Sequence, residues 1–166
     1  RDYEDPRLVE CFPSLADFIT THSRVPASEH EAIAMTIARH EVGKVPAWAA
    51  LALRSVAEQS AIAIVSNVWA TSHCWKEELV ASGVAPILAT AIFSTEVGAI
   101  KPSARPFLAA LDAVGASPDE VLFVGDSLEL NILPARKLGM TTCLVGTSTP
   151  GVAADFHIQS IAELAR

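Results

Sequence analysis

Three polar residues of the kinds that handle phosphate follow apolar runs of the sequence, in the order hydroxyl, amine and carboxylate. Ser66 ends the run "AIAIVS", Lys101 follows "VGAI", and Asp126 follows "VLFVG". A hydroxyl can bind a phosphoryl oxygen, a lysine can neutralise its charge, and a carboxylate can hold a divalent cation such as Mg²⁺. In combination, the three residues indicate a site for phosphoryl transfer.

Taken singly, each of these residues has a plainer explanation. Ser66 could satisfy the backbone of its own turn, Lys101 could be a solvated surface charge, and Asp126 could cap the helix that follows it. Trp69, three residues after Ser66, is expected to pack in the interior, although its place at the mouth of the site also suits contact with a substrate. Function is therefore inferred from the combination, in which each polar residue precedes a different predicted helix.

Two amides stand beside the candidate residues. Asn67 directly follows Ser66 and could shape a substrate pocket, and Asn131 lies five positions after Asp126. An amide at position 131 carries no charge, so we expect weaker Mg²⁺ binding than an acid would give there. The alternative is that Asn131 caps the next helix, and Pro134 favours a helix that starts near Asn131 because proline is tolerated only in a first turn.

Strand and helix patterns alternate around these residues. Apolar runs predict strands at 61–67, 87–95, 121–127 and 141–146, and helices are predicted at 46–59, 72–82, 103–114 and 131–138. Such alternation is typical of βαβ units around a parallel sheet, whose ligands bind beyond the carboxyl ends of the strands. That edge would gather Ser66, Asp126 and the strand-end residues Ser94 and Thr95.

Residues 1–45 differ in character from the rest. They contain no strand pattern, and Ser28 and Glu31 have the spacing of a capping box before a helix that Gly43 would end. We expect a separate helical unit here.

Composition narrows the class of protein. The chain has 166 residues, 51% of them hydrophobic, a formal net charge of −7 and no cluster of Lys and Arg, so nucleic acid and anionic membranes are poor candidates as partners. No apolar run is long enough to span a membrane. Three cysteines without a CxxC pair predict reduced thiols in a cytoplasmic protein, and five scattered histidines without HExxH argue against zinc. The oligomeric state has no sequence signal.

Three stretches together resemble the haloacid dehalogenase-like (HAD) hydrolase superfamily, in the subfamily with a helical cap inserted early in the chain. "IAIVSN", "FSTEVGAIKPSARPF" and "VLFVGDSLELNILPARKLGM" are similar to its second, third and fourth motifs, and "ADFHIQSIAEL" to its last strand and helix. The resemblance covers residues 46–166. It implies an α/β fold, a three-layer Rossmann-like core with a parallel sheet, preceded by a partial helical cap at residues 1–45.

The resemblance also implies roles for single residues. Ser66 would contact the substrate phosphate with Asn67 beside it, and Lys101 would bridge the phosphate and the nucleophile. Asp126 would be a ligand of Mg²⁺, and Asn131 takes the place of a second metal-binding acid.

The first motif of the family is missing from the sequence. The family begins with a strand ending in Asp-x-Asp, whose first aspartate is the nucleophile, and none of the aspartates here starts such a pair. Either the chain is a fragment that lacks this central strand, or it is a natural, non-catalytic relative. We expect the fragment, since the chain opens on Arg1 rather than on Met.

The resulting expectation is a Mg²⁺-dependent phosphatase of a small phosphorylated metabolite, acting through an aspartyl-phosphate, with the nucleophile absent from this chain. The alternative is a non-catalytic HAD-like domain that binds a phosphorylated ligand or a protein partner. Carbon–halogen hydrolysis is disfavoured, because Gly125-Asp126 differs from the Ser-Ser-Asn-like fourth motif of the dehalogenase branch.

Overall fold

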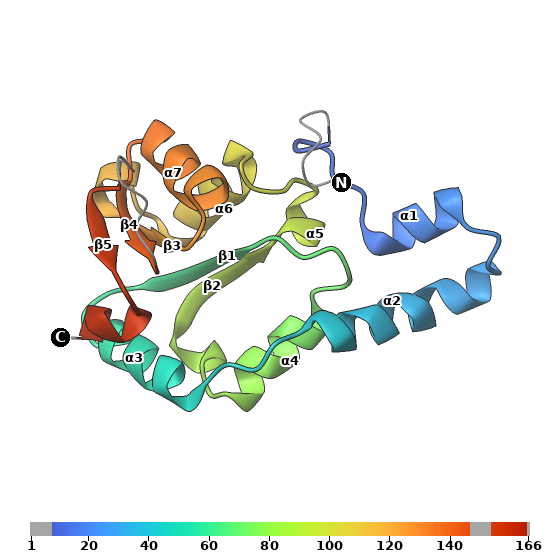
Figure 1. The fold of residues 1–166 in the computed structure, drawn as a ribbon, viewed down its shortest axis with the longest axis horizontal. Helices are drawn as coiled ribbons and strands as arrows, with labels where there is room; N and C mark the ends of the chain where they lie inside the picture. Colours follow the sequence, from blue (N-terminus) through green and yellow to red (C-terminus); the bar gives the residue numbers. More distant parts are fainter. Residues whose placement is uncertain (1–7, 147–153, 166) are drawn as a thin grey trace.

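The computed structural model describes residues 8–146 and 154–165. Its α-helices are α1 (Leu15–His22), α2 (Ala27–Glu41), α3 (Ala47–Ala57), α4 (His73–Ala81), α5 (Ser94–Val97), α6 (Ala104–Val114) and α7 (Leu133–Lys137). The strands are β1 (Ile62–Ser66), β2 (Leu88–Phe93), β3 (Leu122–Gly125), β4 (Thr141–Val145) and β5 (Phe156–Ile158). Short 3₁₀ helices span Ala85–Ile87, Pro118–Glu120 and Ile161–Ala165, and a π-helical turn, η4, spans Leu128–Ile132. The predicted alternation of strands and helices is confirmed (Figure 1).

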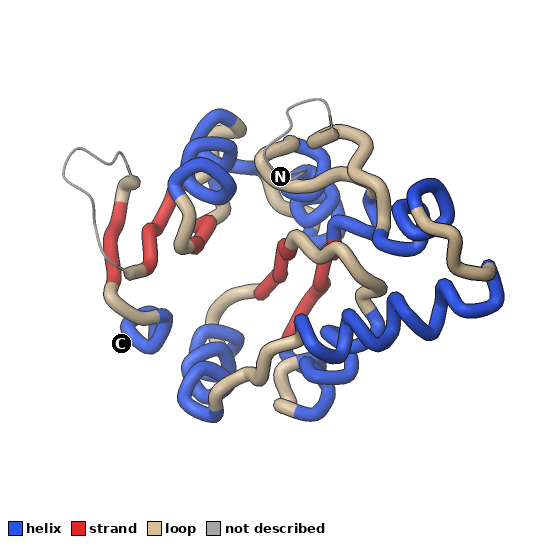
Figure 2. The backbone as a smooth tube through the Cα atoms, turned by 45° about the vertical axis from the view of Figure 1, so that its right-hand side comes forward, coloured by secondary structure: helices blue, strands red, loops and turns tan. Residues whose placement is uncertain are grey.

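Every strand pairing among the described residues is parallel, as predicted, but the strands form two sheets. β1 pairs with β2, which places Ser66 opposite Phe93. β3 pairs with β4, and β4 pairs with β5. Within the described ranges no strand joins β1 to β3, and Figure 2 shows the two groups of strands apart. The α/β class is therefore confirmed, with the sheet divided between β1 and β3.

Helices lie on both sides of the strands. α6 and α7 lie above them and α3 and α4 below in the view of Figure 1. α6 starts at a serine cap, where Ser103 Oγ accepts a hydrogen bond from the backbone N–H of Arg105 at 3.1 Å, and it ends at Gly115 with a φ of 69°. Because this cap lies two residues after Lys101, the start of α6 fixes the segment that carries the candidate lysine.

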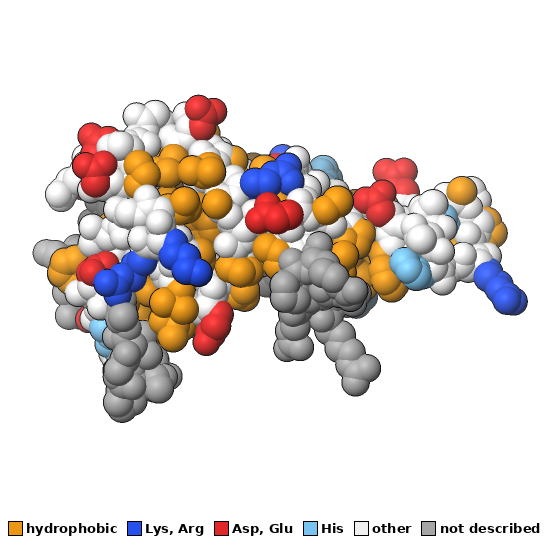
Figure 3. Space-filling view, turned by 90° about the horizontal axis from the view of Figure 1, so that it is seen from above, with side chains coloured by type: hydrophobic (Ala, Val, Ile, Leu, Met, Phe, Trp, Pro, Cys, Tyr) orange, Lys and Arg blue, Asp and Glu red, His pale blue; other side chains and the backbone are white. Residues whose placement is uncertain are grey.

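Two apolar clusters hold these layers together. One is formed by α6, α7 and the residue before β4, and its buried members are Phe107, Leu111, Ala135 and Met140. The other joins α1 and α2 to the loop after β1 and to α4, and its buried members are Leu15, Ile19, Ala34, Ala38, Ala70 and Cys74. Hydrophobic side chains also reach the surface on the face seen in Figure 3, and the exposed leucines of α6 and α7 are Leu108 and Leu133. Among the described helices, none has the length and apolar character that crossing a bilayer requires.

The start of α2 differs from its prediction. The helix begins at Ala27 with Pro26 as its N-cap residue, so Ser28 lies inside the first turn and does not cap it. Proline already has a fixed backbone angle close to the helical one and no N–H that needs a partner, which lets the chain enter the helix directly after it.

The helix after Asp126 also starts earlier than predicted. Helical structure begins at Leu128 as the π-turn η4, and Ser127 is its N-cap, with Oγ accepting from the N–H of Leu130 at 3.1 Å. The interpretation of Asn131 as a helix cap is therefore wrong. Pro134 is the second residue of α7, which continues directly from η4, so the proline does not mark the start of the helical segment.

Candidate active site

Lys101 connects the two sheets through its side chain. Its Nζ donates to the carbonyl oxygen of Val65 in β1 at 3.0 Å and to Oδ1 of Asn131 at 2.7 Å. Asn131 belongs to η4, directly after β3. Residues that are 30 positions apart in sequence therefore meet at the carboxyl ends of β1 and β3.

The amide of Asn131 lies between a cation and a carboxylate. Its oxygen faces Lys101, and its Nδ2 donates to Oδ1 of Asp126 at 3.1 Å. This orientation satisfies both groups, because the amide oxygen can only accept and the NH₂ can only donate. Asn131 is 5% exposed, whereas Asp126 is open to solvent. The structure thus brings Lys101, Asn131 and Asp126 into one hydrogen-bonded chain.

Burial changes the acidity of the lysine. Loss of water around Nζ lowers the pKa of Lys101 below its ordinary value, and the negative charge of Asp126 opposes this shift. A cation with few water neighbours attracts an anion more strongly than a solvated surface lysine does. The end of β1 therefore offers a concentrated positive charge to an anionic group.

Gly125 makes the approach of Asn131 to β3 possible. A Cβ atom at this position would lie 2.5 Å from Cβ and 2.7 Å from Cγ of Asn131, well inside van der Waals contact. The sequence reasoning missed this role. A glycine at the end of an otherwise apolar strand is the signal that could have found it, because it often marks a close approach.

Asn67 holds the backbone of Lys101. Its Oδ1 accepts from the Lys101 N–H at 2.8 Å, and its Nδ2 donates to the Lys101 carbonyl at 3.1 Å. Both ends of the amide are thus engaged by the same residue. Asn67 thus contacts Lys101, and its predicted role toward a substrate stays a prediction.

The strand-end residues Ser94 and Ser66 have different surroundings. Ser94 is 2% exposed, and its hydroxyl donates to the carbonyl of Val68 and accepts from the N–H of the same residue. Ser66 lines a cavity of about 250 Å³. Within the described chain its hydroxyl has no hydrogen-bond partner, so it is available to a ligand. The structure does not join Ser66 to Lys101 by a hydrogen bond, although Ser66 directly follows the Val65 carbonyl that Lys101 contacts.

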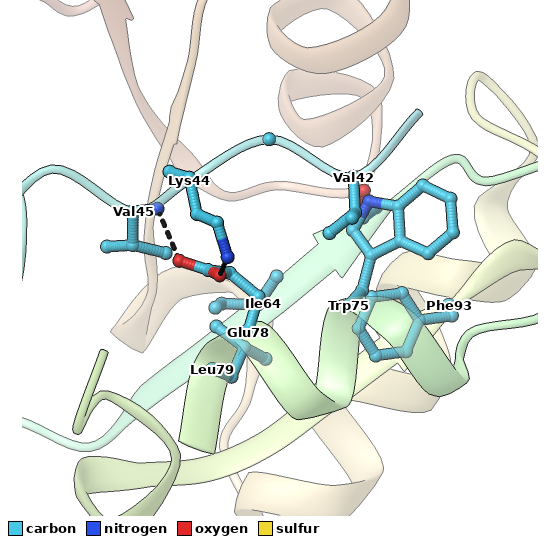
Figure 4. A pocket seen from close by; sticks show the side chains of 10 residues that line it. Val42, Lys44, Val45, Ile64, Trp75, Glu78, Leu79 and Phe93 are labelled. Carbon is cyan, nitrogen blue, oxygen red and sulfur yellow. Dashed lines mark hydrogen bonds and ion pairs between the residues drawn. The ribbon is translucent and has the colours of Figure 1, made fainter. Parts of the chain in front are cut away.

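The cavity beside Ser66 has mostly apolar walls. Figure 4 shows Trp75 and Phe93 on one side of it and the ion pair of Lys44 and Glu78, with Leu79, on the other. In this pair Lys44 Nζ donates to Glu78 at 2.7 Å, and the N–H of Val45 donates to the other carboxylate oxygen at 2.8 Å. The hydrogen bond from Lys44 lowers the pKa of Glu78. These charges neutralise one another and tie the segment before α3 to α4.

The residues present fit a divalent cation in part. Asp126 supplies an exposed carboxylate, the ligand type that Mg²⁺ prefers together with water and substrate phosphate. The oxygen of Asn131 is instead bonded to Lys101. Across residues 8–146 and 154–165 no three acids, histidines or cysteines gather around a point that could hold a metal.

Comparison with known proteins decides the family. A family model of the haloacid dehalogenase-like hydrolases matches residues 31–145. The chain belongs to this family. The resemblance of its motifs to HAD hydrolases is thereby confirmed.

Two curated relatives of this HAD chain are phosphatases. It is 30% identical over 108 residues to phosphoserine phosphatase of Thermus thermophilus, covering 63% of this chain and 43% of that protein. It is 33% identical over 66 residues to glyceraldehyde 3-phosphate phosphatase of Methanopyrus kandleri, covering 40% of this chain and 28% of that protein. The chain therefore spans less than half the length of these two relatives.

Solved HAD structures share the fold. A HAD phosphatase from Thermococcus onnurineus matches with a TM-score of 0.66 and 23% identity, covering 89% of this chain and 66% of that one. A 2-haloacid dehalogenase from Pseudomonas syringae pv. Tomato DC3000 matches with a TM-score of 0.67 and 21% identity, covering 90% of this chain and 66% of that one. Because a phosphatase and a dehalogenase match equally well, the fold does not choose between the two reactions.

Proposed function

We propose that the whole protein is a Mg²⁺-dependent phosphatase of a small phosphorylated metabolite. The observation that carries the proposal is the Lys101 ammonium, held between β1 and Asn131 and paired with Asp126 through that amide. A fixed, partly buried cation beside an exposed carboxylate suits a phosphate ester bound next to a metal ion. Phosphatases among the relatives support this choice.

Each site residue has a role in the proposal. Lys101 neutralises the phosphoryl oxygens, and the free hydroxyl of Ser66 donates a hydrogen bond to one of them. Asn67 shapes the phosphate subsite. Asp126 is the direct Mg²⁺ ligand, and Asn131 belongs to the metal site by holding the Asp126 carboxylate. When bound, Mg²⁺ would neutralise charge that develops on the phosphoryl group.

The nucleophile of the proposed reaction comes from outside the given sequence. A carboxylate oxygen of an aspartate attacks phosphorus, the ester P–O bond breaks, and the alcohol leaves with a proton from a general acid. Water then attacks phosphorus in the aspartyl-phosphate, which releases inorganic phosphate and restores the aspartate. In this scheme residues 46–166 form the core and residues 1–45 form part of the cap.

Replacement of the lysine tests the proposal. Lys101→Ala in the whole protein should lower kcat/KM for a phosphate ester by about 10²–10³, because the charge that stabilises the phosphoryl oxygens is gone. Lys137→Ala, which removes an exposed lysine of α7, is the matched control and should retain activity. A wild-type value of kcat/KM in Lys101→Ala would show that Lys101 does not take part in the reaction.

One observation favours a second function, a non-catalytic domain that binds a phosphorylated ligand. No Asp-x-Asp pair occurs anywhere in the 166 residues. The two functions are separated by assaying the whole protein for Mg²⁺-dependent release of phosphate. Binding of inorganic phosphate that depends on Lys101, without any turnover, would favour the binding domain.

A further inference from the structure

Three consecutive residues after β1 hold three different parts of the molecule. Asn67 bonds both backbone groups of Lys101, at 2.8 and 3.1 Å. The N–H and carbonyl of Val68 are both bonded to the hydroxyl of Ser94, at 2.9 and 2.8 Å. Because Ser94 is 2% exposed, water does not compete for this middle contact.

The third residue, Trp69, joins the loop to α1. Its carbonyl accepts from the N–H of Leu15, the first residue of α1, at 2.9 Å. Its ring meets the ring of Phe18 edge-on, with centroids 5.5 Å apart. Trp69 also packs against the apolar cluster that α1 shares with α2. The loop is thus fastened to the helical pair at one end and to Lys101 at the other.

We propose that residues 67–69 form a junction through which α1 sets the position of Lys101, with Asn67 and Trp69 as positioning residues. The junction is three residues long, so only Val68, which is bonded to Ser94, separates the residue that contacts α1 from the residue that contacts Lys101. A displacement at Trp69 moves Asn67, and both hydrogen bonds of Asn67 end on the lysine backbone. Its importance for turnover rests on the proposed function, in which Lys101 binds the phosphoryl group.

Amide hydrogen exchange tests the Asn67 end of the junction without an activity assay. Asn67→Ala removes the acceptor of the Lys101 N–H, so that amide should exchange about fivefold to tenfold faster, the factor that one hydrogen bond corresponds to. The amide of Ile100 is the internal control, because it donates to the carbonyl of Val9 and does not involve the junction. Unchanged exchange at Lys101, or an equal increase at Ile100, would overturn the role of Asn67.

The Trp69 end needs a pair of variants. Trp69→Ala should speed amide exchange at Leu15 and also at Lys101, which Trp69 does not touch. Trp69→Phe keeps an aromatic ring against Phe18, so exchange at both amides should stay slow. Trp48→Ala, which removes a tryptophan that is 53% exposed on α3, is the matched control and should leave both amides unchanged. Faster exchange at Leu15 alone in Trp69→Ala would show that α1 does not position Lys101.

Kinetics of the whole protein separate the junction from the proposed function. Asn67→Ala and Trp69→Ala should lower kcat more than they raise KM, because a misplaced Lys101 supports the reacting phosphoryl group less well than the bound ester. If the wild-type protein hydrolyses no phosphate ester, the proposed phosphatase function is wrong. Amide exchange at Lys101 would still test whether residues 67–69 position the lysine. An active wild type with unaltered exchange in both variants would overturn the junction alone.

Discussion

At residue 131, one neutral amide satisfies a cation and a carboxylate at the same time. Its oxygen accepts from Lys101 at 2.7 Å, and its NH₂ donates to Asp126 at 3.1 Å. A carboxylate at this position would still accept from Lys101, but it would face Asp126 with a like charge. The amide therefore links the Asp126 carboxylate to Lys101 without placing a like charge beside it.

Changing this amide to an acid tests its effect on the metal. Asn131→Asp adds a negative charge beside Asp126, and we expect the affinity for Mg²⁺ to rise roughly tenfold, because ligand charge tunes the affinity of such sites. Isothermal titration with Mg²⁺ alone measures the change. Glu129→Gln alters an exposed acid of the same turn and serves as the control. Equal Mg²⁺ affinity in wild type and Asn131→Asp would show that residue 131 does not contribute to Mg²⁺ binding.

Gly125 is the other residue whose size matters at this point. Gly125→Ala should lower the free energy of unfolding by about 1–3 kcal/mol, the range for overpacking, because the new Cβ would overlap Asn131. Gly43→Ala is the matched control, since a Cβ there meets nothing within 4 Å. Urea unfolding of both variants measures the difference. Similar stability in the two alanine variants would mean that Asn131 moves away at little cost.

Among the elements, β4 is tied to the segment before β5 by a buried threonine. The N–H and the hydroxyl of Thr142 both donate to Oδ2 of Asp155, at 2.8 and 2.7 Å, and Thr142 is fully buried. The hydroxyl hydrogen bond, followed by that of the backbone, lowers the pKa of Asp155 below its ordinary value of 3.8. This carboxylate therefore stabilises the β4–β5 connection more when it is ionised than when it is protonated.

The connection should make stability depend on pH in the acid range. Because the folded pKa of Asp155 lies below 3.8, its contribution is complete above the ordinary pKa and is lost as the pH falls through the folded value. Thr142→Val removes the hydroxyl donor, so the variant should lose less stability than wild type between about pH 6 and about pH 3. Urea unfolding at the two pH values measures this, with Asp155→Asn as the control that lacks the carboxylate. An equal acid loss in wild type and Thr142→Val would contradict the assignment.

At the scale of the whole molecule, the sequence predicted the order of strands and helices because their signals are local. Apolar runs end at polar residues, and glycines at 83, 115 and 139 adopt positive φ at or just after the ends of helices. The meeting of Lys101, Asn131 and Asp126 was also predictable, since each follows a strand or its loop and parallel strands end at one edge.

Other features depend on partners that no local pattern reveals. Asn67 bonds a residue 34 positions away, and a sequence pattern says nothing about which backbone its amide will meet. The division of the sheet depends on which strands are neighbours, and the close approach of Asn131 to Gly125 depends on how η4 packs against β3. Such contacts follow from tertiary structure alone.

The absence of an Asp-x-Asp pair leads to a prediction for the molecule as a whole. The 166-residue chain by itself should show no Mg²⁺-dependent hydrolysis of a generic aryl phosphate, because no residue pair supplies both the nucleophile and the general acid. Release of the aryl alcohol, followed by absorbance, is the measurement. Turnover that persists through repurification and disappears in Asp126→Ala would mean that another residue of this chain is the nucleophile.

The π-turn gives the site a dependence on chain length. In η4 both Asn131 and Ile132 donate to the carbonyl of Ser127, so the turn holds one residue more than an α-helical turn would. Loss of one residue between 128 and 130 would let this turn close as an α-helix and rotate the Asn131 amide about 100° around the helix axis, away from Lys101. Related sequences should therefore show substitutions at the exposed position 129 but no deletions in this stretch. A constant length here would mark the relatives that keep a functional site.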